Sequence, residues 1–147
     1  MVKEIIKDIN ILQQKSSKFE FANVSHLTYN YGDEYLIQDM LDTAEYHVDS
    51  CLGLACIQIG VPKRIIVVKI GKQFVPFINP TIIKKSESTY VAKEGCLSLD
   101  GLRDVNRHHW VKVAYTTKDR KPKIEIFRGA TAQIIQHEVD HLNGKLI

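Results

Sequence analysis

The chain has 147 residues, a length that fits one domain with a buried core, so we expect a single domain over residues 1–147. Hydrophobic residues make up 44% of it and charged residues 25%, the usage of an ordinary globular protein, which excludes disordered and collagen-like classes. The apolar run at residues 65–68 is far shorter than the roughly 20 residues of a membrane-spanning helix.

The charge pattern indicates a cytoplasmic protein that does not bind nucleic acid directly. The net charge of +3 is spread along the chain, and the short basic cluster at residues 118–123 is typical of a solvated turn. The first eight residues mix charges with apolar residues and lack the apolar core of a signal peptide. Because the three cysteines cannot all pair, we interpret them as thiols, metal ligands or core residues: Cys51, Cys56 and Cys96.

Hydrophobic periodicity predicts a helix, a series of strands and a second helix. Residues 33–50 carry apolar residues at three- and four-residue spacing, which predicts an amphipathic helix near the N-terminus. Short β-rich segments follow. They are residues 64–70, 74–78, 81–91, 110–116 and 124–127, with Asn79-Pro80 ending the second. Residues 130–142 return to helical spacing and stop at Asn143-Gly144. This order predicts an α+β fold of mainly antiparallel strands packed around a C-terminal helix.

The C-terminal helix carries the pattern His-Glu-x-x-His, the HExxH motif. His137 and His141 are four residues apart and therefore lie about 40° apart around a helix, so both can bind one metal ion. Glu138 lies beside them, where it can act on a water molecule at that ion. Two histidines at this spacing also occur on helices without a metal, so a third ligand is needed to support the interpretation.

The third ligand must come from upstream in the chain. The six residues that follow His141 include no Cys, His, Asp or Glu, which excludes the usual arrangement of zinc proteases. Cys96 is the best candidate, since Gly95 lets the backbone approach closely and β-prone residues follow. Cys51 and Cys56 are its competitors. Two histidines and one cysteine would leave a fourth position open for water, as catalytic metal sites require.

Three segments together resemble the peptide deformylase family. They are Gly53-Leu54-Ala55-Cys56-Ile57-Gln58-Ile59-Gly60, Glu94-Gly95-Cys96-Leu97-Ser98 and Gln136-His137-Glu138-Val139-Asp140-His141, in the family's order and spacing. The resemblance covers most of the chain from about residue 33 to residue 144. It implies a metal-dependent hydrolase that removes the formyl group from the N-terminal formyl-methionine of nascent polypeptides, which it would meet in the cytoplasm of a bacterial-type cell or near the ribosome.

The resemblance also implies a role for each matching residue. Cys96, His137 and His141 would bind one divalent metal ion, with Fe²⁺ favoured and Zn²⁺, Ni²⁺ or Co²⁺ also compatible with these ligands. Glu138 would be the general base and then the general acid. The side-chain amide of Gln58 and the backbone N–H of Leu97 would stabilise the oxyanion. The backbone near Gly53 and Gly95 would pair with the extended peptide substrate.

This sequence departs from the family at one position of the first segment and at another position two residues before it. Cys51 stands where a glycine is usual, and Cys56 replaces an alanine; both are small enough to pack, but they leave the shape of the substrate pocket open. Arg103 and Arg107 are equal candidates for an arginine that faces the substrate or pairs with Glu94.

Two other functions fit parts of the sequence. A metallopeptidase of other specificity could use the same helix, although it usually takes its third ligand downstream. A non-catalytic domain with a structural metal could use Cys51 or Cys56 as a fourth ligand, which would leave Glu138 and Gln58 without a chemical role.

Overall fold

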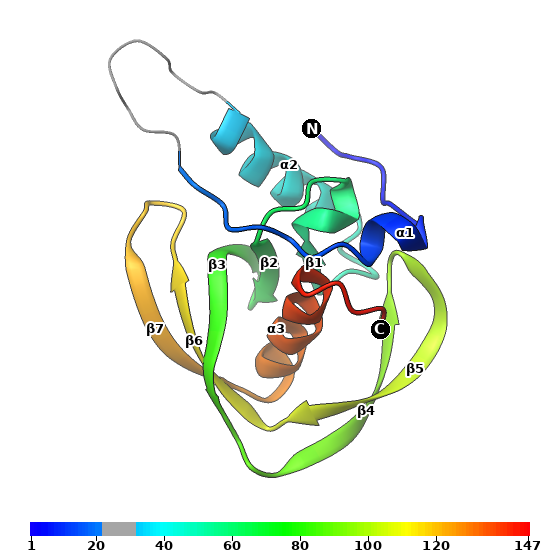
Figure 1. Ribbon diagram of the computed structural model, residues 1–147, viewed down its shortest axis with the longest axis vertical. Coiled ribbons are helices and arrows are strands. Elements are labelled where there is room, and N and C mark those ends of the chain that lie inside the picture. Colours follow the sequence, from blue (N-terminus) through cyan, green and yellow to red (C-terminus); the bar gives the residue numbers. More distant parts are fainter. Residues whose placement is uncertain (22–31) are drawn as a thin grey trace.

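A five-stranded antiparallel sheet packed between two helices forms the frame of the fold (Figure 1). The structure is a computed structural model that describes residues 1–21 and 32–147, with the backbone alone for residues 32–34. The strand order is β1-β2-β3-β6-β7, and a second sheet pairs β4 with β5. The strands are β1 Gly53–Ala55, β2 Ile65–Ile70, β3 Gln73–Lys85, β4 Thr89–Cys96, β5 Leu99–His108, β6 Trp110–Thr116 and β7 Pro122–Arg128. The helices are α1 Ile9–Leu12, α2 Gly32–Tyr46, the 3₁₀-helix η1 Cys56–Ile59, and α3 Gly129–Leu142.

The predicted fold class is confirmed. The strand pairs are antiparallel, and in Figure 1 helix α3 lies at the centre, with β6 and β7 on one side and the curved β4–β5 pair on the other. The predicted amphipathic helix at residues 33–50 corresponds to α2, which ends four residues earlier than expected, at Tyr46. Within the described residues, no helix combines the length and the apolar character that crossing a membrane requires.

Strand β2 is buried on both faces because a helix covers each side of the sheet. Ile66 and Val68 belong to the core cluster that includes Ile135 and Leu142 of α3. The alternate residues of β2 pack in a second cluster with α2, whose buried side chains include Met40. An unbroken apolar run, and not alternation, is what such a strand needs. The two clusters fix α3 on one face of the sheet, and α3 carries the HExxH motif.

The predicted strands at residues 74–78 and 81–91 had the wrong limits. Residues 73–85 form one strand, and the next strand begins at Thr89. Strand β3 continues through Asn79-Pro80, because Asn79 adopts a positive φ of 51° and the pairing with β6 shifts there. The side chain of Asn79 also bonds both the N–H and the C=O of Phe19, at 2.8 Å each. The strand then ends at Lys85, since the buried Ser86 donates its hydroxyl to the Ser88 carbonyl and accepts from the His109 N–H.

Strands β4 and β5 form a hairpin that brings Cys96 next to α3. Cys96 pairs with Leu99, so Leu97 and Ser98 make the turn between the two strands. The sequence patterns did not predict β5, because most of its residues are exposed and show no alternation of apolar and polar side chains. This hairpin positions one of the three proposed metal ligands.

Candidate metal centre and active-site cleft

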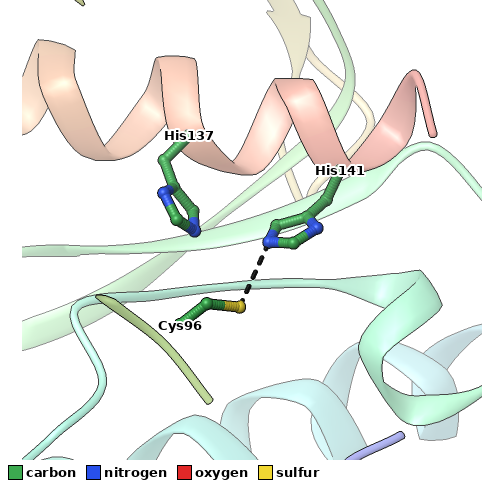
Figure 2. A group of neighbouring side chains, drawn as sticks. All are labelled: Cys96, His137 and His141. Atoms are coloured by element: carbon green, nitrogen blue, oxygen red, sulfur yellow. Dashed lines mark hydrogen bonds between the residues drawn. The ribbon is translucent and has the colours of Figure 1, made fainter. Parts of the chain in front are cut away.

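Cys96, His137 and His141 lie together in the structure, as the sequence predicted (Figure 2). One ligand atom from each residue lies within 4.8 Å of the others, and the Cys96 sulfur is 3.3 Å from Nε2 of His141. Figure 2 shows both imidazole rings reaching from one side of α3 toward Cys96. This set of one thiol and two imidazoles, brought together from a helix and a hairpin, fits one divalent metal ion with a position left open.

The electrostatics of the two histidines also fit a cation. Burial lowers the pKa of His141 to about 3, so this imidazole is neutral, the form that binds a metal. Burial opposes protonation of His137 as well, but its hydrogen bonds to Cys96 and Glu94 outweigh that effect and raise its pKa to about 10. The surroundings of His137 therefore attract positive charge, which a metal ion would supply in place of the proton.

Glu94 orients His137 for metal binding. Oε1 of Glu94 lies 2.8 Å from Nδ1 of His137, so this carboxylate accepts the Nδ1 proton and leaves Nε2 free for a metal. Burial would raise the pKa of Glu94, but hydrogen bonds from Arg107 and His137 lower it to about 2. Glu94 is therefore a carboxylate at neutral pH.

The open choice between the two arginines is settled by the contact with Glu94. Nε and Nη2 of Arg107 donate to the two oxygens of Glu94, at 2.8 and 2.6 Å, and Arg107 is 3% exposed. Arg103 lies opposite Glu94 in the strand register but is exposed. Arg107 is the partner of Glu94.

Glu138 is a buried carboxylate beside the cluster. It is 4% exposed, Oε1 lies 3.9 Å from Nε2 of His137, and Oε2 has no hydrogen-bond partner among the described residues. Burial raises the pKa of Glu138 to about 7. A group with a pKa near the working pH can both take up and release a proton, which is the property of a general base and acid.

Gln58 reaches the same place from η1. Its Oε1 accepts the N–H of Ala55 at 2.9 Å, which fixes the amide so that Nε2 points to the cluster. Nε2 lies 3.2 Å from the hydroxyl of Ser98 and 3.4 Å from the Cys96 sulfur. The Gln58 amide is therefore a donor held beside the proposed metal site, and Leu97 lies next to it in the hairpin turn.

A cleft of about 370 Å³ opens onto these groups. Gly53 and Gly95 both line it, together with Leu97, Gln58 and Glu138. A side chain at Gly53 would lie 2.7 Å from Ile134 and 3.0 Å from Glu138, so only glycine lets β1 pack this close to α3. The structure thus brings together the residues that the sequence proposed for metal binding, catalysis and substrate contact.

Cys51 and Cys56 lie outside the cluster. Both are buried in the core beside α2, and the thiol of Cys51 lies 3.1 Å from the Gly53 carbonyl. Burial raises the pKa of each thiol to about 12, so both are protonated at neutral pH, whereas a metal binds the thiolate.

We expect Cys51→Ser and Cys56→Ser to keep one metal ion per chain. Cys56→Ser should also lower the free energy of unfolding by about 1–3 kcal/mol, because its hydroxyl enters a fully buried apolar site. Elemental analysis and chemical denaturation measure the two effects. Loss of the metal from either variant, with the metal retained by Cys96→Ser, would mean that the wrong cysteine had been chosen.

Sequence reasoning missed the contact of Ser98 with Gln58 and the contact of Glu94 with His137. A weak signal existed for Glu94, since residues two apart on a strand share a face and Glu94 precedes Cys96 by two. The place of Ser98 depends on the packing of η1 against the hairpin, for which the sequence offers no periodic signal.

A candidate metal site of three ligands beside a buried carboxylate, in a cleft of an α+β fold, is the arrangement of a metal-dependent hydrolase. A family model described as polypeptide deformylase matches residues 2–147. The peptide deformylase of Clostridium beijerinckii is 44% identical over 147 residues, which span all of both chains. The chain belongs to the polypeptide deformylase family.

Solved structures agree with this assignment. The peptide deformylase of Thermotoga maritima superposes with a TM-score of 0.84 at 31% identity, over 99% of this chain and 95% of that one. A class I type b peptide deformylase from Acinetobacter baumannii, bound to Met-Ala-Ser, gives a TM-score of 0.82 at 31% identity, over 99% of this chain and 96% of that one.

Proposed function

We propose that this chain removes the formyl group from the N-terminal formyl-methionine of nascent polypeptides. The observation that carries the proposal is the buried carboxylate of Glu138, which lies in the cleft beside the Cys96, His137 and His141 cluster. A structural metal site would need no such group. We further propose that residues 1–147 act as one domain, which the family model supports by matching nearly the whole chain.

Cys96, His137 and His141 would hold one divalent ion in this reaction. Thiolate and imidazole ligands suit Fe²⁺, Zn²⁺, Ni²⁺ and Co²⁺, and the resemblance to the family favours Fe²⁺ for this chain. A bound ion supplies Lewis acidity and lowers the pKa of water at the site toward about 7. Glu94 supports this role by keeping the Nδ1 proton of His137 away from the metal-binding nitrogen.

Glu138 would move the proton. Its buried carboxylate can accept a proton from the attacking water and then deliver it to the nitrogen that leaves as the formyl–nitrogen bond breaks. Its buried Oε2, which has no hydrogen-bond partner among the described residues, is a free acceptor for that proton. Because Gly53 lets β1 press against Glu138, the side chain has little freedom to turn away from the cleft.

Gln58 and the N–H of Leu97 would stabilise the negative oxygen that forms on the formyl carbon. Donors held in place before the reaction typically contribute about 2.7–4 kcal/mol each, since they need no reorganisation as the charge develops. Gln58 meets this condition, because Ala55 and Ser98 fix both ends of its amide.

We expect Gln58→Met to lower kcat by about 10²–10³-fold while the metal content stays near that of the wild type. Methionine keeps the length of the side chain but removes the donor. Ser98→Ala is the control, since it removes a partner of the amide and leaves the donor itself. Steady-state kinetics with a formyl-methionine peptide measure both variants. A Gln58→Met variant that turns over at the wild-type rate with full metal would contradict the role of the amide.

The substrate would bind as an added strand between β1 and β4. In the described part of the chain, β1 pairs with β2 alone and β4 with β5 alone, so each has one edge without a strand partner. Gly53 and Gly95 lie on these two strands and line the cleft. An extended peptide can pair with such edges through its backbone, independently of its sequence, which suits an enzyme that acts on many nascent chains.

We also propose that the protein works in the cytoplasm of a bacterial-type cell, on chains that emerge from or have just left the ribosome. The chemistry of the substrate supports this location. Formyl-methionine is the first residue of a new polypeptide, so the enzyme would act on it soon after synthesis begins.

Comparison of three peptides tests the proposed substrate. Formyl-Met-Ala-Ser should release formate, whereas acetyl-Met-Ala-Ser and a longer peptide without a formyl group should stay intact. A metallopeptidase of other specificity would instead cleave an internal bond of the longer peptide. Mass spectrometry of the products separates these outcomes.

A further inference from the structure

The metal cluster is divided between two parts of the fold. His137 and His141 lie on α3, whereas Cys96 lies on β4, which belongs to the separate two-stranded sheet (Figures 1 and 2). The ligand atoms can stay within 4.8 Å of one another only if the sheet keeps its position on the helix. Contacts between the β4–β5 sheet and α3 therefore determine the geometry of the cluster.

One chain of charged groups joins these two parts and begins and ends on α3. Oδ2 of Asp140 accepts from Nη1 of Arg107 on β5 at 2.6 Å. Arg107 donates its other two nitrogens to Glu94 on β4, and Glu94 accepts from His137. Arg107 and Glu94 are 3% and 6% exposed. The chain thus closes a ring from Asp140 to His137, three residues apart on one helix.

We infer that Asp140 is a positioning residue for the metal centre. It acts through Arg107 and Glu94, and it holds both the ring of His137 and the strand that carries Cys96. The inference rests on the proposed metal site. Two carboxylates share the single guanidinium, so each limits the movement of the other, and charge-assisted contacts of this kind are strong and directional.

The other contacts of the site show why this series of charged groups matters. Nδ1 of His141 has no hydrogen-bond partner among residues 1–21 and 32–147, whereas Nδ1 of His137 is held by Glu94. Gln136 also bonds the backbone of His108 on β5, at 2.8 and 2.9 Å, but neither residue contacts a ligand of the cluster. The contact of Asp140 instead fixes Arg107, and through Arg107 the Glu94 carboxylate that holds His137.

The rate of metal release to a chelator tests this role without any turnover. Groups that hold a ligand typically contribute about 10–100-fold in metal affinity, so Glu94→Gln should release Zn²⁺ about 10–100-fold faster than the wild type. Asp140→Asn should accelerate release about tenfold, because a neutral amide holds Arg107 less firmly. Asp140→Glu, which keeps the charge, should restore most of the difference.

A matched control is available at the same carboxylate. Lys145 lies 3.7 Å from Oδ1 of Asp140, on the exposed side, so Lys145→Met removes a partner of Asp140 without touching Arg107. This variant should release the metal at the wild-type rate. Its melting temperature and that of Asp140→Asn, measured on the loaded proteins, separate a general loss of stability from an effect on the site.

The double variant decides whether Asp140 acts through Glu94. If it does, Glu94→Gln with Asp140→Asn should release the metal no faster than Glu94→Gln alone. Multiplied effects in the double variant, or a wild-type rate in Asp140→Asn, would overturn the inference. Should Asp140→Asn fail to fold, Arg107→Lys is the second variant. It keeps the positive charge but cannot bond the two oxygens of Glu94 and Asp140 at once, so it should release the metal as fast as Glu94→Gln. Formate release by the wild type tests the proposed function separately.

Discussion

Glu138→Gln is expected to lower kcat by about 10²–10⁴-fold. The carboxylate is the proposed carrier of the proton from water to the leaving nitrogen, and an amide of the same shape cannot take up that proton. KM should change little, because the amide fills the same buried space beside Gly53 and Ile134. Single-turnover kinetics with a formyl-methionine peptide measure the chemical step directly.

The metal content of the Glu138→Gln variant is part of the same experiment. Glu138 is a neighbour of the ligand cluster and not a member of it, so elemental analysis should find as much metal as in the wild type. Glu125→Gln is the matched control: it makes the same change at a carboxylate of β7 that accepts from the hydroxyl of Tyr115 on β6. A fully loaded Glu138→Gln protein that turns over at the wild-type rate would exclude Glu138 as the proton carrier.

Cys96→Ser is expected to lower kcat/KM by about 10³-fold or more. The serine hydroxyl is a poor replacement for a thiolate, so the site loses a ligand and with it the metal, whose electrostatic contribution is several kcal/mol. Each 1.36 kcal/mol corresponds to a factor of ten in rate. Kinetics and elemental analysis on the same preparation should show activity and metal lost together.

The comparison with Cys51→Ser makes this result specific. Cys51 also lines the cleft, but its sulfur contacts the Gly53 carbonyl and its thiol stays protonated. The same substitution should therefore leave the metal in place. If Cys96→Ser kept one ion per chain and full activity, the assignment of the third ligand would be wrong.

Periodicity in the sequence predicted the elements whose burial is regular. Helices α2 and α3 each present one apolar face to the sheet, and β2 is an unbroken apolar run because helices cover both of its faces. Strand β5 has neither signal, since it lies in a two-stranded sheet and most of its residues are exposed. The ends of β3 depend on Asn79 and Ser86, whose side chains bond distant backbone groups that the local sequence does not show.

In the candidate site, too, local patterns could be predicted and contacts between distant residues could not. His137, Glu138 and His141 could be predicted because helix geometry alone brings them together. The local pattern around Gly95 then favoured Cys96 as the third ligand, and the resemblance to the family indicated Gln58. The arginine that pairs with Glu94 could not be chosen from the sequence. Arg103 and Arg107 are equivalent candidates until the register of β5 and the direction of its side chains are known. For the same reason, the contact of Asp140 with Arg107 becomes visible only in the folded chain.

Formate release from formyl-Met-Ala-Ser is the measurement that tests the central claim most directly. The protein should be loaded with Fe²⁺ under anaerobic conditions, and the formate and the intact Met-Ala-Ser should be quantified together. We predict one formate for each peptide consumed, at a rate that rises with metal content up to one ion per chain and disappears with a chelator. A protein that carries one ion per chain and leaves the formyl peptide unchanged would contradict the account.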